Sequence, residues 1–198
     1  MMRIAIFLSG GGSNARAICS YFKDHSDIQV ALLLSNKEKS GTQQIATDYN
    51  IPYFIFNKEQ FKEGDVLLNA LEKNKIDYII LAGFLWLIPD YLLKNFPDKI
   101  INIHPALLPK YGGKGMHGMH VHQAVWENKE TESGITIHLC NEHYDDGKIL
   151  AQKTTTITEE DTPQQIAQKV LHLEHQYYAS TIEKYINLGS GQTFQLKK

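Results

Sequence analysis

The sequence predicts an α/β fold, doubly wound around a mostly parallel sheet. Short apolar runs alternate with amphipathic segments through the first half of the chain, and a glycine-rich turn follows the first apolar run. In the second half, two apolar runs follow one another with no helix between them. Alternating strands and helices require crossover connections, which place successive strands parallel. We therefore expect a sheet that is parallel at first and mixed towards the C-terminal half.

The apolar runs and the periodic segments give the expected elements in order. Seven runs read as strands: Arg3–Leu8, Ile28–Ser35, Tyr53–Phe56, Tyr78–Ala82, Lys99–His104, Gly134–Cys140 and Ile149–Thr156. Six segments have helical character: Asn14–Phe22, Gly41–Tyr49, Lys58–Asn74, Leu92–Phe96, His120–Glu127 and the long Thr162–Tyr185. Asp161-Thr162-Pro163 is a typical helix start. No repeat or linker interrupts residues 1–198, so we expect one Rossmann-like domain, with residues 189–198 as a tail or an added edge strand.

Composition narrows the class of protein. Twenty basic and 22 acidic residues give a net charge of −2, which does not favour nucleic acid as a partner. The two cysteines, Cys19 and Cys140, form no CxxC pattern, so neither a disulfide framework nor a zinc site is expected. The first apolar run ends at Ser9-Gly10-Gly11 without a cleavage site, and no run is long enough for a membrane span. We expect a cytoplasmic protein.

A polar pair ends the fifth predicted strand. Asn102 and His104 are two residues apart, so their side chains share one face of a strand, and Pro105 ends the run. Open α/β sheets carry their chemistry at the carboxyl ends of strands. The amide can donate to a developing oxyanion, and the imidazole can move a proton near neutral pH. This pair is the candidate catalytic centre.

The glycine-rich turn, Ser9 to Asn14, follows the first strand and opens a helix. Glycines there let backbone N–H groups approach an anion at the helix N-terminus. The turn is no Walker A loop, because no Gly-Lys-Ser/Thr follows, and it lacks the full GxGxxG fingerprint and a following acidic residue. We therefore favour a phosphate monoester over a dinucleotide. A Rossmann-type dehydrogenase remains an alternative.

Two further clusters carry ionisable side chains. Thr136 and His138 share a strand face, and the turn that contains Asp145 can return a carboxylate to a histidine and favour its charged form. The segment Lys110–His122 carries three histidines, for which we favour a substrate-contacting loop over a metal site. No metal is expected.

These residues together resemble the phosphoribosylglycinamide formyltransferases of purine synthesis. The resemblance covers most of the chain and rests on an ordered set of short motifs. They are Ile6 to Asn14, Ser35-Asn36-Lys37, Leu81-Ala82-Gly83-Phe84, Asn102-Ile103-His104-Pro105, Leu107 to Tyr111, Gly134 to Gly147, and Glu174-His175. It implies an enzyme that transfers the formyl group of 10-formyltetrahydrofolate to the amine of 5-phosphoribosylglycinamide, giving the N-formyl product and tetrahydrofolate.

The resemblance also implies roles for individual residues. Asn102, His104 and Asp145 would be catalytic, with Asp145 supporting His104. Gly12, Ser13 and Asn14 would bind the substrate phosphate, and Glu174 would contact the glycinamide. The folate would lie against Leu85, Trp86, Leu87, Ile88 and Asn102. The N-terminal half would thus bind phosphate, and the C-terminal half would bind folate and carry the catalysis. No metal is implied, and the protein would be a monomer or a homodimer.

The chain departs from the family pattern at three places. Trp86 and Gly64 stand where many members carry arginine, which removes two cations that could meet the folate glutamate tail. The loop Gly112–Met119 is also longer than usual.

Three related enzyme classes and one binding function compete with this interpretation. Methionyl-tRNA formyltransferases and formyltetrahydrofolate deformylases share the Asn-His-Asp core but carry extra domains, for which 198 residues leave no room. A sugar-nucleotide formyltransferase fits less well, because the Gly12-Ser13-Asn14 loop suits a small phosphate ester. A non-catalytic folate-binding or nucleotide-binding module would lack a catalytic group, yet all three are present.

Overall fold

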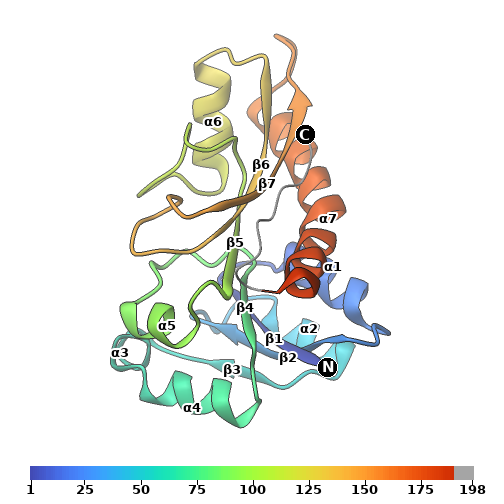
Figure 1. Cartoon of the computed structure of the whole chain (residues 1–198). Helices are drawn as coiled ribbons and strands as arrows, with labels where there is room; N and C mark the ends of the chain where they lie inside the picture. Colours follow the sequence, from blue (N-terminus) through green and yellow to red (C-terminus); the bar gives the residue numbers. More distant parts are fainter. Residues whose placement is uncertain (190–198) are drawn as a thin grey trace. The chain divides into compact units, whose positions relative to one another are not determined.

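The computed structural model describes residues 1–189, and residues 190–198 of the expected tail lie outside the described part. Its internal contacts divide the chain into two compact units (Figure 1). The N-terminal unit comprises Met1–Asn102, and the C-terminal unit begins at Ile103. Each unit is described by itself, and the expectation of a single domain over residues 1–198 stays a prediction.

The strands of the N-terminal unit form the parallel part of the sheet. They are β1 (Met2–Leu8), β2 (Ile28–Ser35), β3 (Tyr53–Ile55), β4 (Tyr78–Leu81) and β5 (Ile100–His104), whose last two residues belong to the next unit. The chain adds β2 and β3 on one side of β1, then β4 and β5 on the other, and these four pairings are parallel. This reversal between β1 and β4 is the topological switch point of a doubly wound sheet.

The helices of this unit follow the apolar pattern of the sequence. Its helices are α1 (Ser13–Phe22), α2 (Thr42–Tyr49), α3 (Lys58–Glu63), α4 (Asp65–Lys73) and α5 (Asp90–Asn95). The first two helices pack against β2 and against each other. Residues 4–8 of β1 and all four residues of β4 are buried, as expected for strands that are covered on both faces. The predicted strands and the first two helices are confirmed to within a few residues.

One predicted helix is wrong. The segment Lys58–Asn74 forms two helices, α3 and α4, separated by Gly64. Gly64 has φ of 91°, its N–H donates to the Gln60 carbonyl, and a Cβ atom there would lie 2.9 Å from the Tyr91 ring. The helical spacing of the apolar residues continues across this position, so the pattern alone hides the break.

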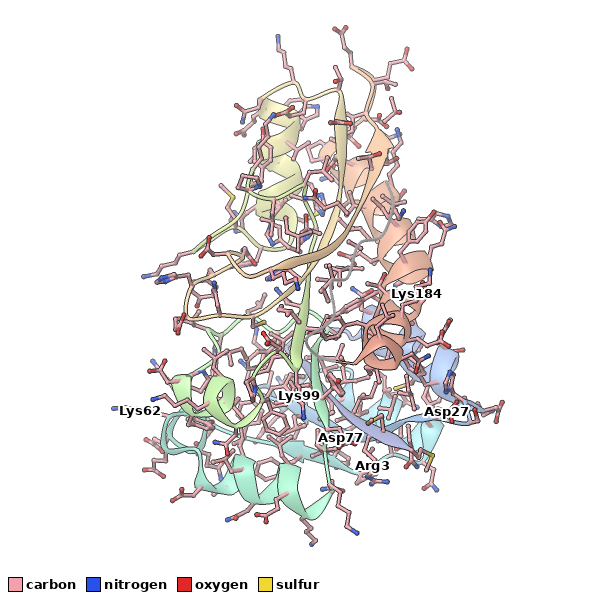
Figure 2. The ribbon with its side chains drawn as sticks, viewed as in Figure 1. Arg3, Asp27, Lys62, Asp77, Lys99 and Lys184 are labelled. Carbon is pink, nitrogen blue, oxygen red and sulfur yellow. The ribbon has the colours of Figure 1, made fainter. Side chains whose placement is uncertain are left out.

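Arg3 ties the start of β1 to the turn that precedes β4. Its backbone N–H donates to Asp77 Oδ2 at 2.8 Å, and its Nε atom donates to the Asn74 carbonyl at 2.6 Å. Figure 2 labels Arg3 and Asp77 at this end of the sheet. The two bonds hold the amino ends of β1 and β4 together. They thereby fix the register of these two neighbouring strands.

The C-terminal unit is built on an antiparallel pair of strands and a long helix. It contains α6 (Met119–Glu127), β6 (Glu132–Leu139), β7 (Ile149–Thr156) and α7 (Pro163–Leu188), and the seven strands have the order β3-β2-β1-β4-β5-β6-β7. β6 and β7 pair antiparallel, and α7 packs against both strands and against α6. Thr162 and Gln165 form a capping box at the start of α7. The mixed sheet and the long C-terminal helix are therefore confirmed.

Candidate active site

The glycine turn forms an open helix N-terminus at the switch point. Gly12 precedes α1 with φ of 78°, and a Cβ atom there would meet Ile45 Cδ1 at 2.6 Å, so only glycine fits. No side chain caps the helix, and its first turn holds no acidic residue. The N-terminus of the helix, which begins at Ser13, therefore presents a positive dipole end that suits an anion.

Ser9 connects this turn to the segment that follows β4. The Ser9 N–H donates to the Gly83 carbonyl at 3.1 Å, and the Leu85 N–H donates to Ser9 Oγ at 3.3 Å. The two loops that leave the switch point are thus joined by a buried hydroxyl. Sheets of this topology bind ligands in the crevice outside these two loops.

The segment after β4 presents apolar side chains over an aromatic cluster. Leu85 and Leu87 are each 41% exposed, whereas Ile88 is buried. The Trp86 ring centroid lies 5.2 Å from that of Phe61, and its ring also contacts Phe56 and Phe84. Aromatic packing of this kind fixes the indole, so the segment offers a firm apolar surface to a flat ligand. All four predicted folate residues of this segment lie within the N-terminal unit.

β5 places Asn102 and His104 where the sequence predicts them. Asn102 is half-buried and pairs in register with Leu81 of β4, and His104 is buried as the last residue of the strand. Strand alternation puts the two side chains on the same face.

Asp145 meets His104 from the turn between β6 and β7. Asp145 Oδ2 lies 3.4 Å from His104 Nδ1 and also accepts the Gly113 N–H at 2.9 Å. The other ring nitrogen, His104 Nε2, lies 2.7 Å from the Tyr111 carbonyl oxygen. Asp145 has φ of 55°, and Gly147 lies so close to the Leu139 carbonyl that no side chain fits there. The tight turn thus carries the carboxylate back to the end of β5.

Thr136 and Gln152 hold the chain that leaves β5. The Leu108 N–H donates to Thr136 Oγ1 at 3.0 Å, and this hydroxyl donates to the Ala106 carbonyl at 2.7 Å. Gln152, which is in register with Thr136, donates from Nε2 to the Leu108 carbonyl at 2.9 Å. Sequence reasoning missed Gln152, because only the strand register brings it to this loop. The sequence did point to Thr136, because this residue shares a strand face with His138.

Burial is the main influence on the pKa of His104. Burial lowers the pKa of His104 below its ordinary value, and the opposing effects of Asp145 and of the Tyr111 carbonyl do not restore it. Asp145 does favour the charged imidazole, as predicted, but burial outweighs its effect on the pKa of His104. The sequence shows that a carboxylate is near but not how little water reaches the ring.

The carboxylate itself stays ionised. Burial alone would raise the pKa of Asp145, but its interaction with His138, the charge of His104 and the Gly113 N–H together lower it. His138 is buried on β6, and its Nε2 atom lies 3.7 Å from Asp145 Oδ1. Asp145 therefore lies between two imidazoles.

His122 is a third buried histidine near this pair. Burial and the charge of His104 lower its pKa from 6.5 to about 4, and its buried Nδ1 atom has no hydrogen-bond partner among residues 1–189. The other two histidines of the predicted loop, His117 and His120, contact each other ring to ring at 5.6 Å. Among residues 1–189, no three His, Cys, Asp or Glu side chains are arranged to hold a metal ion.

Glu174 is buried on α7, in the same unit as His104 and Asp145. Of the predicted site residues, the structure brings His104 and Asp145 into direct contact. Gly12, Ser13, Asn14 and the segment from Leu85 to Ile88 lie in the N-terminal unit, which ends at Asn102. The predicted division into a phosphate-binding N-terminal half and a folate-binding C-terminal half stays a prediction.

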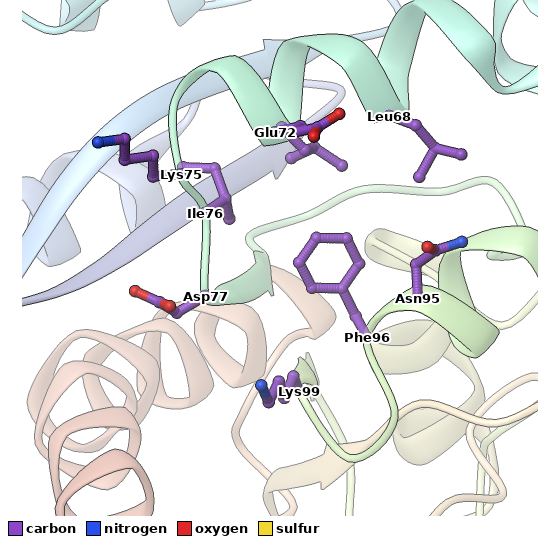
Figure 3. A pocket seen from close by; sticks show the side chains of 9 residues that line it. Leu68, Glu72, Lys75, Ile76, Asp77, Asn95, Phe96 and Lys99 are labelled. Atoms are coloured by element: carbon purple, nitrogen blue, oxygen red, sulfur yellow. The ribbon is translucent and has the colours of Figure 1, made fainter.

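A pocket of about 580 Å³ lies elsewhere in the N-terminal unit (Figure 3). Its lining includes Lys75, Asp77, Phe96 and Lys99. Asp77 and Lys99 immediately precede β4 and β5, so this pocket lies at the amino ends of the strands. None of the predicted site residues lines it. Within residues 1–189, no helix is long and apolar enough to cross a membrane.

Comparison with known proteins gives consistent matches. The family described as "Formyl transferase" matches residues 2–182. The chain is 44% identical over 186 residues to the chloroplastic phosphoribosylglycinamide formyltransferase of Arabidopsis thaliana, covering 91% of this chain but only 64% of that protein. It is 36% identical to the phosphoribosylglycinamide formyltransferase of Bacillus subtilis (strain 168), covering 96% of this chain and 97% of the relative. The crystal structure of the Bacillus halodurans phosphoribosylglycinamide formyltransferase superposes with a TM-score of 0.84 at 32% identity, over 96% of this chain and 97% of the other.

Proposed function

Because the chain belongs to the formyl transferase family, we propose that it transfers the formyl group of 10-formyltetrahydrofolate to the amine of 5-phosphoribosylglycinamide, in purine biosynthesis. The products are N-formyl-phosphoribosylglycinamide and tetrahydrofolate. The observation that carries the proposal is the buried His104–Asp145 pair at the carboxyl end of β5, in a chain similar to two named phosphoribosylglycinamide formyltransferases.

The reaction requires one new bond and two proton movements. The substrate amine attacks the formyl carbon, and the formyl oxygen becomes an alkoxide. The amine then loses a proton, and the alkoxide re-forms the formyl carbonyl as the bond from the formyl carbon to the folate nitrogen breaks. That nitrogen takes the bonding electron pair and gains a proton. Asn102 donates a hydrogen bond to the alkoxide, an interaction worth roughly 3 kcal/mol of barrier in comparable sites. The neutral ring of His104, favoured by burial, takes the proton from the amine and returns it to the leaving nitrogen.

The remaining residues bind the substrates. Gly12, Ser13 and Asn14 receive the substrate phosphate at the uncapped N-terminus of α1. Glu174 accepts a hydrogen bond from the glycinamide. Leu85, Trp86, Leu87 and Ile88 line the folate, whose flat rings suit an apolar surface, and Asn102 contacts it at the formyl group. Gly64 and Trp86 supply no cation for the glutamate tail, so we expect weak discrimination by tail length.

The cellular context follows from the same proposal. The partners are the two small-molecule substrates, with neither nucleic acid nor membrane required, and the protein acts as a monomer or a homodimer. We propose the cytoplasm as its location, because both cysteines are free in the structure, although the Arabidopsis relative is named chloroplastic.

The deciding experiment follows the absorbance change as 10-formyltetrahydrofolate loses its formyl group, with and without phosphoribosylglycinamide. Loss only in the presence of the glycinamide supports the proposal, and release of formate without an acceptor would instead support a deformylase. Absence of turnover in both reactions, with a folded sample, would support a binding module. Binding of NAD in a separate titration would indicate a dehydrogenase.

Variants of the phosphate loop test the substrate. We expect Ser13→Asp to raise KM for phosphoribosylglycinamide by about tenfold or more, because a carboxylate at the first helical position repels the phosphate. Ser20→Asp, at an exposed position later in the same helix, is the matched control and should leave KM unchanged. Equal effects of the two substitutions would show that the phosphate does not bind at this helix end.

A further inference from the structure

Residues 110–113, here called the Tyr111 loop, hold both members of the His104–Asp145 pair. The Tyr111 carbonyl oxygen lies 2.7 Å from His104 Nε2, and the Gly113 N–H donates to Asp145 Oδ2 at 2.9 Å. Gly112 lies between these two contacts, and a Cβ atom there would be only 3.3 Å from Asp145 Cβ. The loop and the pair belong to the same compact unit. The position of the Tyr111 loop therefore determines how the pair is arranged.

Two acceptors compete for the single ring proton of neutral His104. The Tyr111 carbonyl oxygen lies 2.7 Å from Nε2, whereas Asp145 Oδ2 lies 3.4 Å from Nδ1. A carbonyl oxygen only accepts hydrogen bonds, and the shorter distance is the one typical of a hydrogen bond. The proton therefore lies on Nε2, and Nδ1 is the nitrogen that can gain a proton. If the carbonyl moved away, the carboxylate would draw the ring proton to Nδ1 instead.

The backbone of Tyr111 needs an external hold. Tyr111 has φ of 57°, in the left-handed region that is uncommon for residues other than glycine. A residue keeps such a conformation only where its surroundings fix it, and such residues cluster at functional sites. The Tyr111 side chain has a hold of this kind, because its hydroxyl donates to Glu130 Oε1 at 2.8 Å.

Glu130 is itself fixed by the end of α6. The Lys129 N–H donates to the Trp126 carbonyl at 3.0 Å, and the Glu130 N–H donates to the Val125 carbonyl at 3.3 Å. Lys129 has φ of 51°. This pair of bonds around a left-handed residue is a Schellman motif, which ties the backbone of Glu130 to the last turn of the helix.

The charges of this anchor suit its role. Glu130 Oε1 also accepts from Lys110 Nζ at 2.9 Å, and the bonds from Lys110 and Tyr111 lower the pKa of Glu130. Burial and the Glu130 carboxylate raise the pKa of Tyr111 to about 12. The carboxylate is therefore ionised and the hydroxyl keeps its proton near neutral pH, which makes the bond between them a charge-assisted one.

We propose that Glu130 is a positioning residue for the formyl transfer, which holds the Tyr111 hydroxyl and so keeps the Tyr111 carbonyl on His104 Nε2. The neutral ring then has its bare Nδ1 beside Asp145, where the carboxylate stabilises an added proton. This inference rests on the proposed function only in taking His104 as the ring that moves the proton.

The tautomer of His104 tests the inference in the free protein, without any substrate. We would measure the nitrogen-15 shifts of its ring at about pH 8, where burial keeps the ring neutral. In the wild type we expect the Nε2–H tautomer, and in Glu130→Ala a shift towards the Nδ1–H tautomer, because Asp145 then wins the proton. Glu132→Ala, at an exposed position at the start of β6, is the matched control and should keep the wild-type tautomer. The same tautomer in Glu130→Ala and in the wild type would overturn the proposal.

Two further variants test the path through the Tyr111 hydroxyl. Glu130→Gln keeps an oxygen that accepts from this hydroxyl, so we expect it to keep the wild-type tautomer. Tyr111→Phe removes the donor and should reproduce the effect of Glu130→Ala, and the double variant should be no worse than either single one. Additive effects of the two substitutions, or a Gln variant that behaves like the Ala variant, would refute this path.

Kinetics give the second readout, in variants whose circular dichroism spectra match that of the wild type. We expect Glu130→Ala and Tyr111→Phe to lower kcat by about tenfold and to leave KM for both substrates within about twofold, because only the reacting ring is misplaced. A fall in kcat with an unchanged tautomer would show a merely structural role and contradict the inference. Absence of turnover in the wild type would count against the proposed function, whereas the tautomers would still decide the role of Glu130.

Discussion

Three features of His104 bear on its reactivity. It is buried, its Nε2 atom donates to a backbone carbonyl, and its Nδ1 atom faces a carboxylate. Substituting His104→Ala removes the proton carrier, so we expect kcat to fall by about 10²- to 10⁴-fold. The far-ultraviolet circular dichroism spectrum should stay that of the wild type, because the ring is held by one loop carbonyl and one side chain. Wild-type turnover in this variant would remove His104 from the mechanism.

We expect His122 to make the protein less stable in acid. Burial lowers its pKa from 6.5 to about 4, so the folded state holds the neutral ring while the unfolded chain binds a proton first. We therefore expect the contribution of His122 to stability to be complete above pH 6.5 and to be lost as the pH falls towards 4. The loss amounts to about 3 kcal/mol, at roughly 1.4 kcal/mol for each pKa unit.

The substitution His122→Gln isolates this effect. We expect urea unfolding of the variant to lose less stability between pH 7 and pH 4.5 than that of the wild type, by about 2 to 3 kcal/mol. The exposed His172→Gln control should follow the wild type. Parallel stability curves for His122→Gln and the wild type would show that His122 does not cause the acid sensitivity.

At the scale of elements, Gly64 separates α3 from α4, whereas the apolar pattern predicts a single helix. We expect Gly64→Ala to cost about 2 kcal/mol of unfolding free energy, because φ of 91° disfavours any side chain and the new methyl group would press on Tyr91. The Tyr91 hydroxyl donates to the Phe61 carbonyl, so the ring cannot easily move aside. Gly10→Ala, where an added methyl group meets open space, is the control for urea unfolding. Equal stability of both variants would contradict a structural requirement for glycine at position 64.

Much of the element order follows from the sequence, because burial on both faces leaves long apolar runs such as those of β1 and β4. The Asn102-x-His104 spacing also predicts a shared strand face, whatever the rest of the fold. What the sequence hides depends on distant pairing. Gln152 reaches Leu108 only through the register of β6 with β7, and the pKa of His104 is set mainly by burial. The spacing of residues along the chain reveals neither the register of two strands nor the solvent access of a side chain.

For the whole molecule, the two compact units raise the question of how the chain unfolds. The two tryptophans lie one in each unit, Trp86 in the aromatic cluster after β4 and Trp126 on α6. If residues 1–198 behave as one domain, as the sequence predicts, Trp86→Phe and Trp126→Phe should give coincident unfolding curves by fluorescence and circular dichroism. Two separate midpoints would show that the units unfold independently and would refute the prediction of a single domain.

The two cysteines allow the wild-type protein to be probed by chemical labelling, without any substitution. Cys19 belongs to α1 of the N-terminal unit and Cys140 to the turn after β6. Burial raises the pKa of Cys19 to about 12 and raises that of Cys140 as well, so both sulfur atoms are held as unreactive thiols while the fold is closed. Cys19 is buried, so it can be alkylated only when its surroundings open, whereas Cys140 is half-buried. The rate of labelling at Cys19 therefore reports how often the surroundings of α1 open in the wild-type protein under native conditions.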